Sequence, residues 1–117
     1  MTANDKLEND AVVIVYGTYP TADVAERIGA GLVERGLAAC VNVLAGMTSI
    51  YVWEGKLQRE PEVPMLVKTT AGRTDEVIAA VRAVHPYSNP ALLVLPVAGG
   101  SADFLAWVRA ETLPRGA

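Results

Sequence analysis

Residues 37–70 constrain the fold more strongly than any other part of the chain. Within this stretch, 40–44 and 50–53 alternate their side chains with a period of two and are rich in β-branched residues, a pattern that predicts β-strand. Ala45-Gly46 separates them and lacks the Asn-Gly or Asp-Gly pair typical of a tight hairpin. We therefore expect one long strand that is bent by a bulge or kink at this point.

The chain is expected to reverse after this strand, at Glu54-Gly55-Lys56. Gly55 suits the turn because glycine adopts a positive φ without a steric penalty. On the return, 58–64 contains two prolines, which cannot donate to a ladder, so we expect an edge, a bulge or irregular backbone there. Residues 65–69 again have strand character. A long bent hairpin is the expected central element, and helices should cover one of its faces.

Five further elements follow from apolar patterns and capping residues. Residues 11–18 form a continuous apolar run, which is typical of a strand in the middle of a sheet. Thr21, Thr74 and Ser101 are suitable N-caps for three helices, and Gly36 is a suitable C-terminal cap. The predicted elements are a strand over 11–18, a helix between Thr21 and Gly36, a helix from Thr74 to His85, a strand over 91–95 and a helix between Ser101 and Pro114.

This order predicts an α+β protein with the ferredoxin-like βαββαβ sandwich, a long bent β-hairpin and an extra C-terminal helix. Residues 11–113 would form a single domain, between an N-terminal tail (1–10) and a C-terminal tail (114–117). Both central helices should lie on one face of an antiparallel sheet. No other segment is long enough to cover the second face, so we expect self-association, with the hairpin as its arm.

Composition excludes several classes of function. The net charge is −3 and the ten Lys and Arg residues are scattered, so nucleic-acid binding is not expected. No apolar run approaches the roughly 20 residues of a membrane span, and no signal peptide is recognisable at the N-terminus. A single cysteine fits a reducing compartment. The expected location is the cytoplasm, without a membrane partner.

Cys40 and His85 are the candidates for chemistry. Cys40 has two interpretations, a buried structural thiol or a metal or redox thiol. His85 lies at a helix end, where it could contact the helix terminus or face a cleft. One thiol and one imidazole are too few for a metal site, which would need Glu60, Glu62 or a second subunit. No catalytic triad or Gly-rich phosphate loop is present, so we predict no enzyme.

A series of short motifs resembles the CutA divalent-cation tolerance proteins. The similarity spans roughly 12–112. The motifs, in order, are Leu37-Ala38-Ala39-Cys40-Val41-Asn42, Gly46, Ser49-Ile50-Tyr51, Trp53-Glu54-Gly55-Lys56, Leu66-Val67-Lys68-Thr69, His85-Pro86-Tyr87 with Pro90, Leu95-Pro96 and Leu105-Ala106-Trp107. The resemblance implies a ferredoxin-like homotrimer with hairpins and sheet edges joined across subunits. It also implies a link to copper and other divalent metals, and an architecture similar to the PII signalling trimers.

By position, the resemblance implies metal contacts at Cys40 and His85. The side chains that it places along an intersubunit cleft are those of Tyr51, Trp53, Lys68 and Tyr87. The chain also departs from the family pattern. Many members have a cysteine at the position of Tyr19, a proline at Ala45, an aromatic residue at Val52 and a glutamate at Ala91. Two metal ligands that the resemblance would otherwise supply are therefore absent.

We thus expect a cytoplasmic homotrimer that binds Cu(II) or another divalent cation through His85, with Cys40 as a further contact. Three alternatives stay open. The first is a PII-like regulatory trimer that binds a small anion or a partner protein near Lys68 and Trp53. The second is an enzyme with His85 as general base, and the third is a scaffold whose response to metal is indirect.

Overall fold

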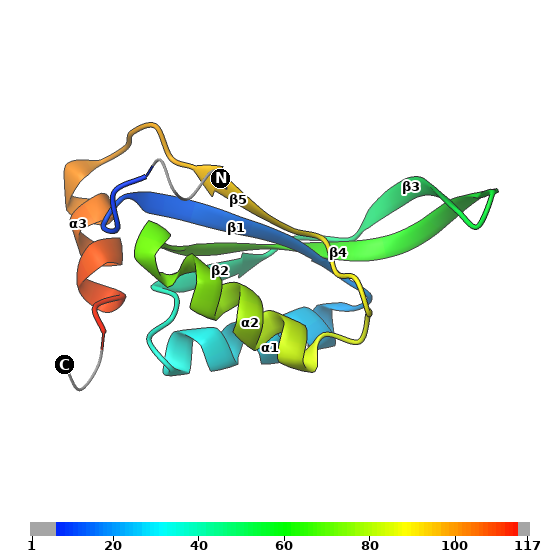
Figure 1. The fold of residues 1–117 in the computed structure, drawn as a ribbon, viewed down its shortest axis with the longest axis horizontal. Helices are drawn as coiled ribbons and strands as arrows, with labels where there is room; N and C mark the ends of the chain where they lie inside the picture. Colours follow the sequence, from blue (N-terminus) through cyan, green and yellow to red (C-terminus); the bar gives the residue numbers. More distant parts are fainter. Residues whose placement is uncertain (1–6, 115–117) are drawn as a thin grey trace.

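The computed structural model describes residues 7–114, and Figure 1 shows a body of sheet and helices from which one hairpin projects. The elements are β1 (Val12–Tyr19), α1 (Ala22–Glu34), β2 (Cys40–Val43), β3 (Met47–Trp53), β4 (Lys56–Thr70), the 3-10 helix η2 (Ala71–Arg73), α2 (Thr74–Val84), β5 (Leu92–Pro96) and α3 (Ala102–Glu111).

The strands form an antiparallel sheet in the order β2-β4-β1-β5, with β3 paired to β4 beyond β2. β1 pairs on both sides, with β4 and with β5, as its continuous apolar sequence predicted. Helices α1 and α2 lie on the same face of this sheet (Figure 1). The prediction of a ferredoxin-like α+β fold with an extra C-terminal helix is confirmed.

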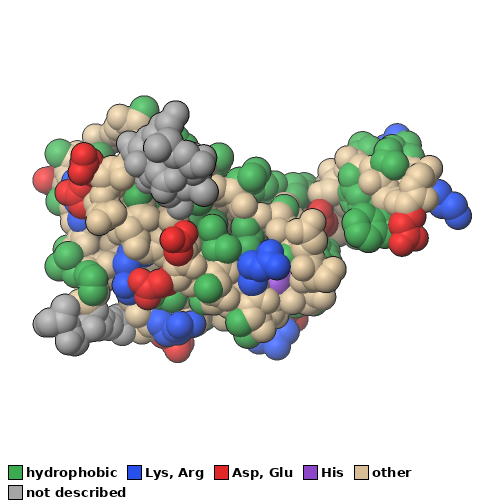
Figure 2. All heavy atoms as spheres, in the orientation of Figure 1, with side chains coloured by type: hydrophobic (Ala, Val, Ile, Leu, Met, Phe, Trp, Pro, Cys, Tyr) green, Lys and Arg blue, Asp and Glu red, His purple; other side chains and the backbone are tan. Residues whose placement is uncertain are grey.

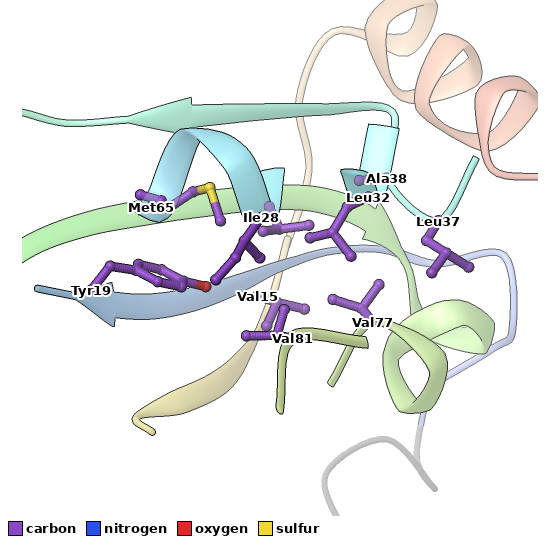
Figure 3. Packing of buried hydrophobic residues seen from close by; sticks show 11 residues of the cluster. Val15, Tyr19, Ile28, Leu32, Leu37, Ala38, Met65, Val77 and Val81 are labelled. Carbon is purple, nitrogen blue, oxygen red and sulfur yellow. The ribbon is translucent and has the colours of Figure 1, made fainter. Parts of the chain in front are cut away.

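The main core fills the space between the sheet and these two helices (Figure 3). Gly29 lets α1 approach the sheet closely, because a Cβ there would lie 2.8 Å from both Met65 Sδ and Val41 Cγ2. Gly31 has no atom within 4 Å of such a position, so the close contact involves Gly29 and not Gly31. The labelled core residues are Val15, Tyr19, Ile28, Leu32, Leu37, Ala38, Met65, Val77 and Val81.

A one-residue bulge separates β2 from β3. Val43 pairs with Met65, whereas Met47 pairs with Glu62, so residues 44–46 lie opposite only residues 63 and 64. The predicted bulge at Ala45-Gly46 is therefore confirmed. A bulge bends its strand and increases the local twist, and beyond this point β3 and the first half of β4 leave the body (Figure 1). We call this projecting hairpin, residues 47–62, the arm.

β4 runs without a break through both prolines. The expectation of irregular backbone is wrong, because each proline lies where no ladder donor is needed. The carbonyl of Pro64 accepts the Leu44 N–H at the bulge. The N–H and C=O of one strand residue point to the same side, so the N–H that Pro64 lacks would also face the bulge. By the alternation along an antiparallel strand, the missing N–H of Pro61 lies on the open side of the arm. The expectation of an edge is thus confirmed for the arm within residues 7–114.

The local signals for turns and caps were accurate in some places and wrong in others. Glu54 and Gly55 have φ values of 50° and 78°, so the predicted turn carries a second left-handed residue. The Thr21 hydroxyl accepts the Val24 N–H at 3.2 Å, as predicted for an N-cap. Thr74 is the first residue within α2 instead, and its hydroxyl donates to the Ala71 carbonyl at 2.8 Å. The side chain of Ser101 makes no capping hydrogen bond to α3.

Helix α3 covers one end of the sheet face opposite α1 and α2. Val108 is fully buried there in a second cluster with Val12 and Ala39. The expectation that no segment could cover this face is wrong at that end. Farther along, Leu93 and Leu95 of β5 stay 57% and 43% exposed. Within residues 7–114, part of this face therefore still lacks a covering layer, and we call it the open face.

The segment before β1 is attached to the body. Asn9 accepts the Gly72 N–H through its carbonyl, and the Asp10 carbonyl accepts the Arg109 Nε–H at 2.9 Å. Residues 1–6 and 115–117 of the predicted tails lie outside the described residues. Among residues 7–114, none of the helices is long and apolar enough to cross a membrane.

Candidate functional site

His85 ends α2 as its C-cap residue and is 8% exposed. Its Nε2 lies 2.9 Å from the Thr18 carbonyl oxygen, and its Nδ1 accepts the Tyr87 N–H at 3.1 Å. A carbonyl oxygen can only accept, so these bonds assign the proton to Nε2 and the lone pair to Nδ1. The imidazole ring also packs between Tyr19 and Tyr87, with centroid distances of 4.9 and 4.8 Å. His85 therefore joins the end of α2 to the end of β1.

Tyr87 connects His85 to the arm. Its hydroxyl donates to Glu62 Oε2 at 3.2 Å, while its backbone N–H occupies Nδ1 of His85. Desolvation, followed by the charge of Glu62 and the hydrogen bond to it, raises the pKa of Tyr87 to about 12. The phenol thus stays protonated near neutral pH and remains a donor to the carboxylate. One residue holds both an imidazole and a carboxylate in place.

A cavity of about 430 Å³ lies where the arm meets the body, and Figure 2 shows the molecule narrowing at this junction. The wall is formed by Thr18, Tyr51, Trp53, Glu62, Tyr87, Ser88, Asn89 and Ala91. Tyr51, Trp53 and Tyr87, three of the four residues that the resemblance places along an intersubunit cleft, line this cavity within one chain. Among the described residues in this wall, Glu62 is the charged one, so the cavity favours a cation over an anion.

The arm has two faces of different character, because residues paired across two strands share a face. Tyr51 pairs with Gln58, on the face that borders the cavity. Val52 pairs with Leu57 on the opposite face, where both are exposed, by 67% and 64%. Ile50 extends this second face and is also more than half exposed. We call it the apolar face of the arm.

Comparison with known proteins identifies the chain. Residues 13–111 match the family of CutA1 divalent ion tolerance proteins. The chain belongs to this family. It is 41% identical over 108 residues to the divalent-cation tolerance protein CutA of Escherichia coli, covering 92% of this chain and 96% of that protein.

Solved CutA structures have the same fold. The divalent cation tolerance protein of Thermus thermophilus has a TM-score of 0.84 and 42% identity, covering 86% of this chain and 98% of that one. A CutA of Archaeoglobus fulgidus, described as periplasmic, has a TM-score of 0.85 and 36% identity over 87% and 99% of the two chains. The resemblance drawn from the sequence motifs is confirmed. The family is named for tolerance of divalent cations and not for a reaction.

Cys40 and Lys68 lie away from the cavity. They pair directly across β2 and β4, and Lys68 in turn pairs with Ile14 of β1. Ile14 and Thr18 are four positions apart on β1, a rise of roughly 13 Å. Cys40 is half-buried, so the expectation of a buried thiol is wrong for the single chain. Lys68 Nζ lies 5.3 Å from the ring centroid of Phe104. The structure thus does not bring Cys40 to His85.

Some features of the site could not be predicted from the sequence. Thr18 holds His85 through a backbone carbonyl 67 residues away, and a backbone atom carries no residue-type signal. Ala91 lines the cavity at the position where the CutA pattern led us to expect glutamate. Within residues 7–114, no cluster of three or more His, Cys, Asp or Glu side chains could hold a metal ion.

Proposed function

We propose that this CutA-family protein contributes to divalent-cation tolerance by binding a cation, such as Cu(II), at His85. The observation that carries the proposal is the bridge made by Tyr87, which occupies Nδ1 of His85 with its N–H and Glu62 Oε2 with its hydroxyl. Displacement of this one residue frees an imidazole nitrogen and a carboxylate oxygen together. Cu(II) binds such nitrogen and oxygen donors more tightly than other first-row divalent ions do.

The same contacts suggest how the cation would be received. The carboxylate of Glu62 attracts it to the cavity, and the exposed loop that carries Tyr87 moves aside. Nδ1 then offers its lone pair, while Nε2–H keeps its bond to the Thr18 carbonyl. A ligating imidazole is commonly oriented by such a bond through its other nitrogen, which also raises its basicity. Water or another subunit would complete the coordination.

We further propose that the protein is a homotrimer in the cytoplasm. The support lies in the apolar face of the arm and in the open face of the sheet, both exposed in the single chain. An isolated two-stranded hairpin is marginally stable in water. Contact with another copy would therefore stabilise the arm more than the body. Cys40 belongs to the open face. A metal contact through Cys40 would therefore form between subunits and separately from His85.

The test is a calorimetric titration of Cu(II) at neutral pH into the wild type and four variants. His85→Ala should abolish the saturable site and Glu62→Gln should weaken it. Glu26→Gln is the control, because Glu26 is an exposed carboxylate on α1 outside the cavity wall. Cys40→Ser should leave the His85 site intact. Absence of saturable binding in the wild type, or unchanged binding in His85→Ala, overturns the metal proposal.

The trimer is tested independently by light scattering. The expected mass is three times that of the 12.4 kDa chain. A stable mass of 12.4 kDa at micromolar concentration contradicts it.

A further inference from the structure

Three aromatic side chains and a carboxylate surround the arm cavity. Tyr51 and Trp53 reach it from β3, Tyr87 from the loop after α2 and Glu62 from β4. Tyr51 and Trp53 share a face because they are two residues apart on one strand. The volume of about 430 Å³ lies within the range of roughly 300–1,000 Å³ that is typical of small-molecule sites. The wall thus has the size and the composition of a ligand site.

The electrostatics of this wall favour a ligand of positive charge. The faces of aromatic rings are negative, and they attract cations that approach them. Glu62 adds a full negative charge. Neither cation of the paired arm residues lines the cavity. Arg59 pairs with Ile50 on the apolar face, whereas Lys56 pairs with Trp53 at the tip and shares its face. An anion would therefore meet unfavourable charge in the cavity.

The polarity of the wall further restricts the chemical class of the ligand. The wall residues include three aromatic side chains, together with the hydroxyl residues Thr18 and Ser88 and the amide residue Asn89. A hydrated metal ion gains little from aromatic rings, whereas an alkylated ammonium group gains both the cation–π attraction and the burial of its methyl groups. Tyr87 is fixed by His85 and Glu62, so its ring is already in position.

We propose that the arm cavity binds a small organic cation with a methylated ammonium group, held between Tyr51, Trp53 and Tyr87 and neutralised by Glu62. This inference goes beyond the metal proposal and can fail independently of it. The organic cation needs Tyr87 in place, whereas metal binding at His85 requires Tyr87 to leave.

The first test uses choline as the probe and tryptophan fluorescence as the signal. The chain has two tryptophans, so Trp107→Phe leaves Trp53 as the sole reporter. Choline should change the Trp53 emission with saturation in the millimolar range. Its neutral isostere 3,3-dimethyl-1-butanol should bind about tenfold more weakly, because it keeps the methyl groups but lacks the charge. Equal binding of the two, or no saturable change up to about 100 mM choline, overturns the proposal.

The second test assigns the contacts by NMR titration of choline. Trp53→Leu and Tyr87→Leu should each weaken binding about tenfold, whereas Tyr87→Phe keeps its ring and should lose at most about threefold. Glu62→Gln should weaken binding and reduce its dependence on salt. Phe104→Leu is the matched control, an exposed aromatic residue on α3 outside the cavity. Unchanged binding in both leucine variants of the cavity overturns the proposal.

Two further readouts separate the alternatives. Cu(II) titration of Trp53→Leu distinguishes the two proposals. Cu(II) binding should be unchanged in this variant while choline binding is weakened, because the metal contacts of His85 and Glu62 do not involve Trp53. A lysine or arginine side chain of a second copy could fill the cage instead. Choline would then bind only when the protein is diluted below its association range, and that result also overturns the proposal.

Discussion

A single strand, β4, belongs to two regions with opposite environments. Its second half lies under α1 and α2, where Met65 and Val67 are almost completely buried. Its first half lies in the arm, where Leu57 is 64% exposed. Both halves contain apolar residues, so hydrophobicity alone does not decide burial. The layer that covers the strand decides burial, and the described residues of one chain provide that layer for the body and not for the arm.

The two regions should therefore differ in what stabilises them. The body holds its backbone through a close-packed core, which responds to the loss of even one methylene group. The arm has one strand pair and a tight turn, and its side chains gain little until another molecule covers them. The candidate site lies at the border, with Tyr87 from the body and Trp53 from the arm. Four predictions test this difference, from the largest effect on unfolding to the smallest.

The largest effect is expected in the body, for Leu32→Ala. Leu32 is 2% exposed within the main core, and truncation leaves a cavity that the helix and sheet cannot close. The free energy of unfolding should fall by about 2–5 kcal/mol, measured by denaturant titration at fixed protein concentration. A loss below about 1 kcal/mol would show that the core rearranges around the gap and would remove the contrast with the arm.

Tyr19, at the edge of the body core, should make stability depend on alkaline pH. Burial raises its pKa from 10.0 to about 12. Between these values the unfolded chain loses the phenolic proton while the folded chain keeps it, so stability falls as pH rises. The loss should reach about 2–3 kcal/mol near pH 12. In Tyr19→Phe this part of the decline should be absent, and identical pH profiles for the two proteins would refute the assignment.

The turn of the arm should respond to Gly55→Val by a smaller amount. Gly55 has a φ of 78°, and an L-residue in this region costs about 1–2 kcal/mol. Hydrogen exchange should accelerate in the arm while the body keeps its protection, and assembly of the proposed trimer should weaken. Gly55→Asn is the matched control, because asparagine tolerates positive φ. Unaltered self-association and unaltered exchange in Gly55→Val would show that the turn accepts valine without strain.

The smallest effect on single-chain unfolding is expected for Leu57→Ala, on the apolar face of the arm. Under conditions where the protein is monomeric, the change should stay below about 0.5 kcal/mol. Sedimentation should nevertheless show that association shifts to higher protein concentration. If Leu57→Ala destabilised the monomer as much as Leu32→Ala does, the arm would pack within its own chain, and the comparison would fail.

Much of the fold could be predicted because its signals are local. The alternation in 40–53, the small pair Ala45-Gly46 and the turn at Gly55 gave the long bent hairpin, and the registers confirm the bulge. The errors arose where a local signal met a competing contact. Thr74 has the sequence of an N-cap, yet its hydroxyl bonds the Ala71 carbonyl.

The candidate site was predicted in part. Tyr51, Trp53 and Tyr87 do border one cavity, whereas Lys68 pairs with Cys40 on the open face. Lys68 lies within a strand, so its motif indicated the right element but not its distance from the cavity. By strand alternation it shares a face with Thr18 and Glu62, yet its partner Ile14 lies four positions along β1 from Thr18.

By itself, the sequence determined the order of elements, the bend, the turn and the cap at Thr21, because each depends on residues within a few positions of one another. Only the tertiary structure decided that the Thr18 carbonyl accepts a hydrogen bond from His85 Nε2, that Tyr87 joins His85 to Glu62 and that Leu57 is left exposed. These contacts join residues as many as 67 positions apart. Their partners are set by strand register and helix packing, which balance many weak interactions over the whole chain.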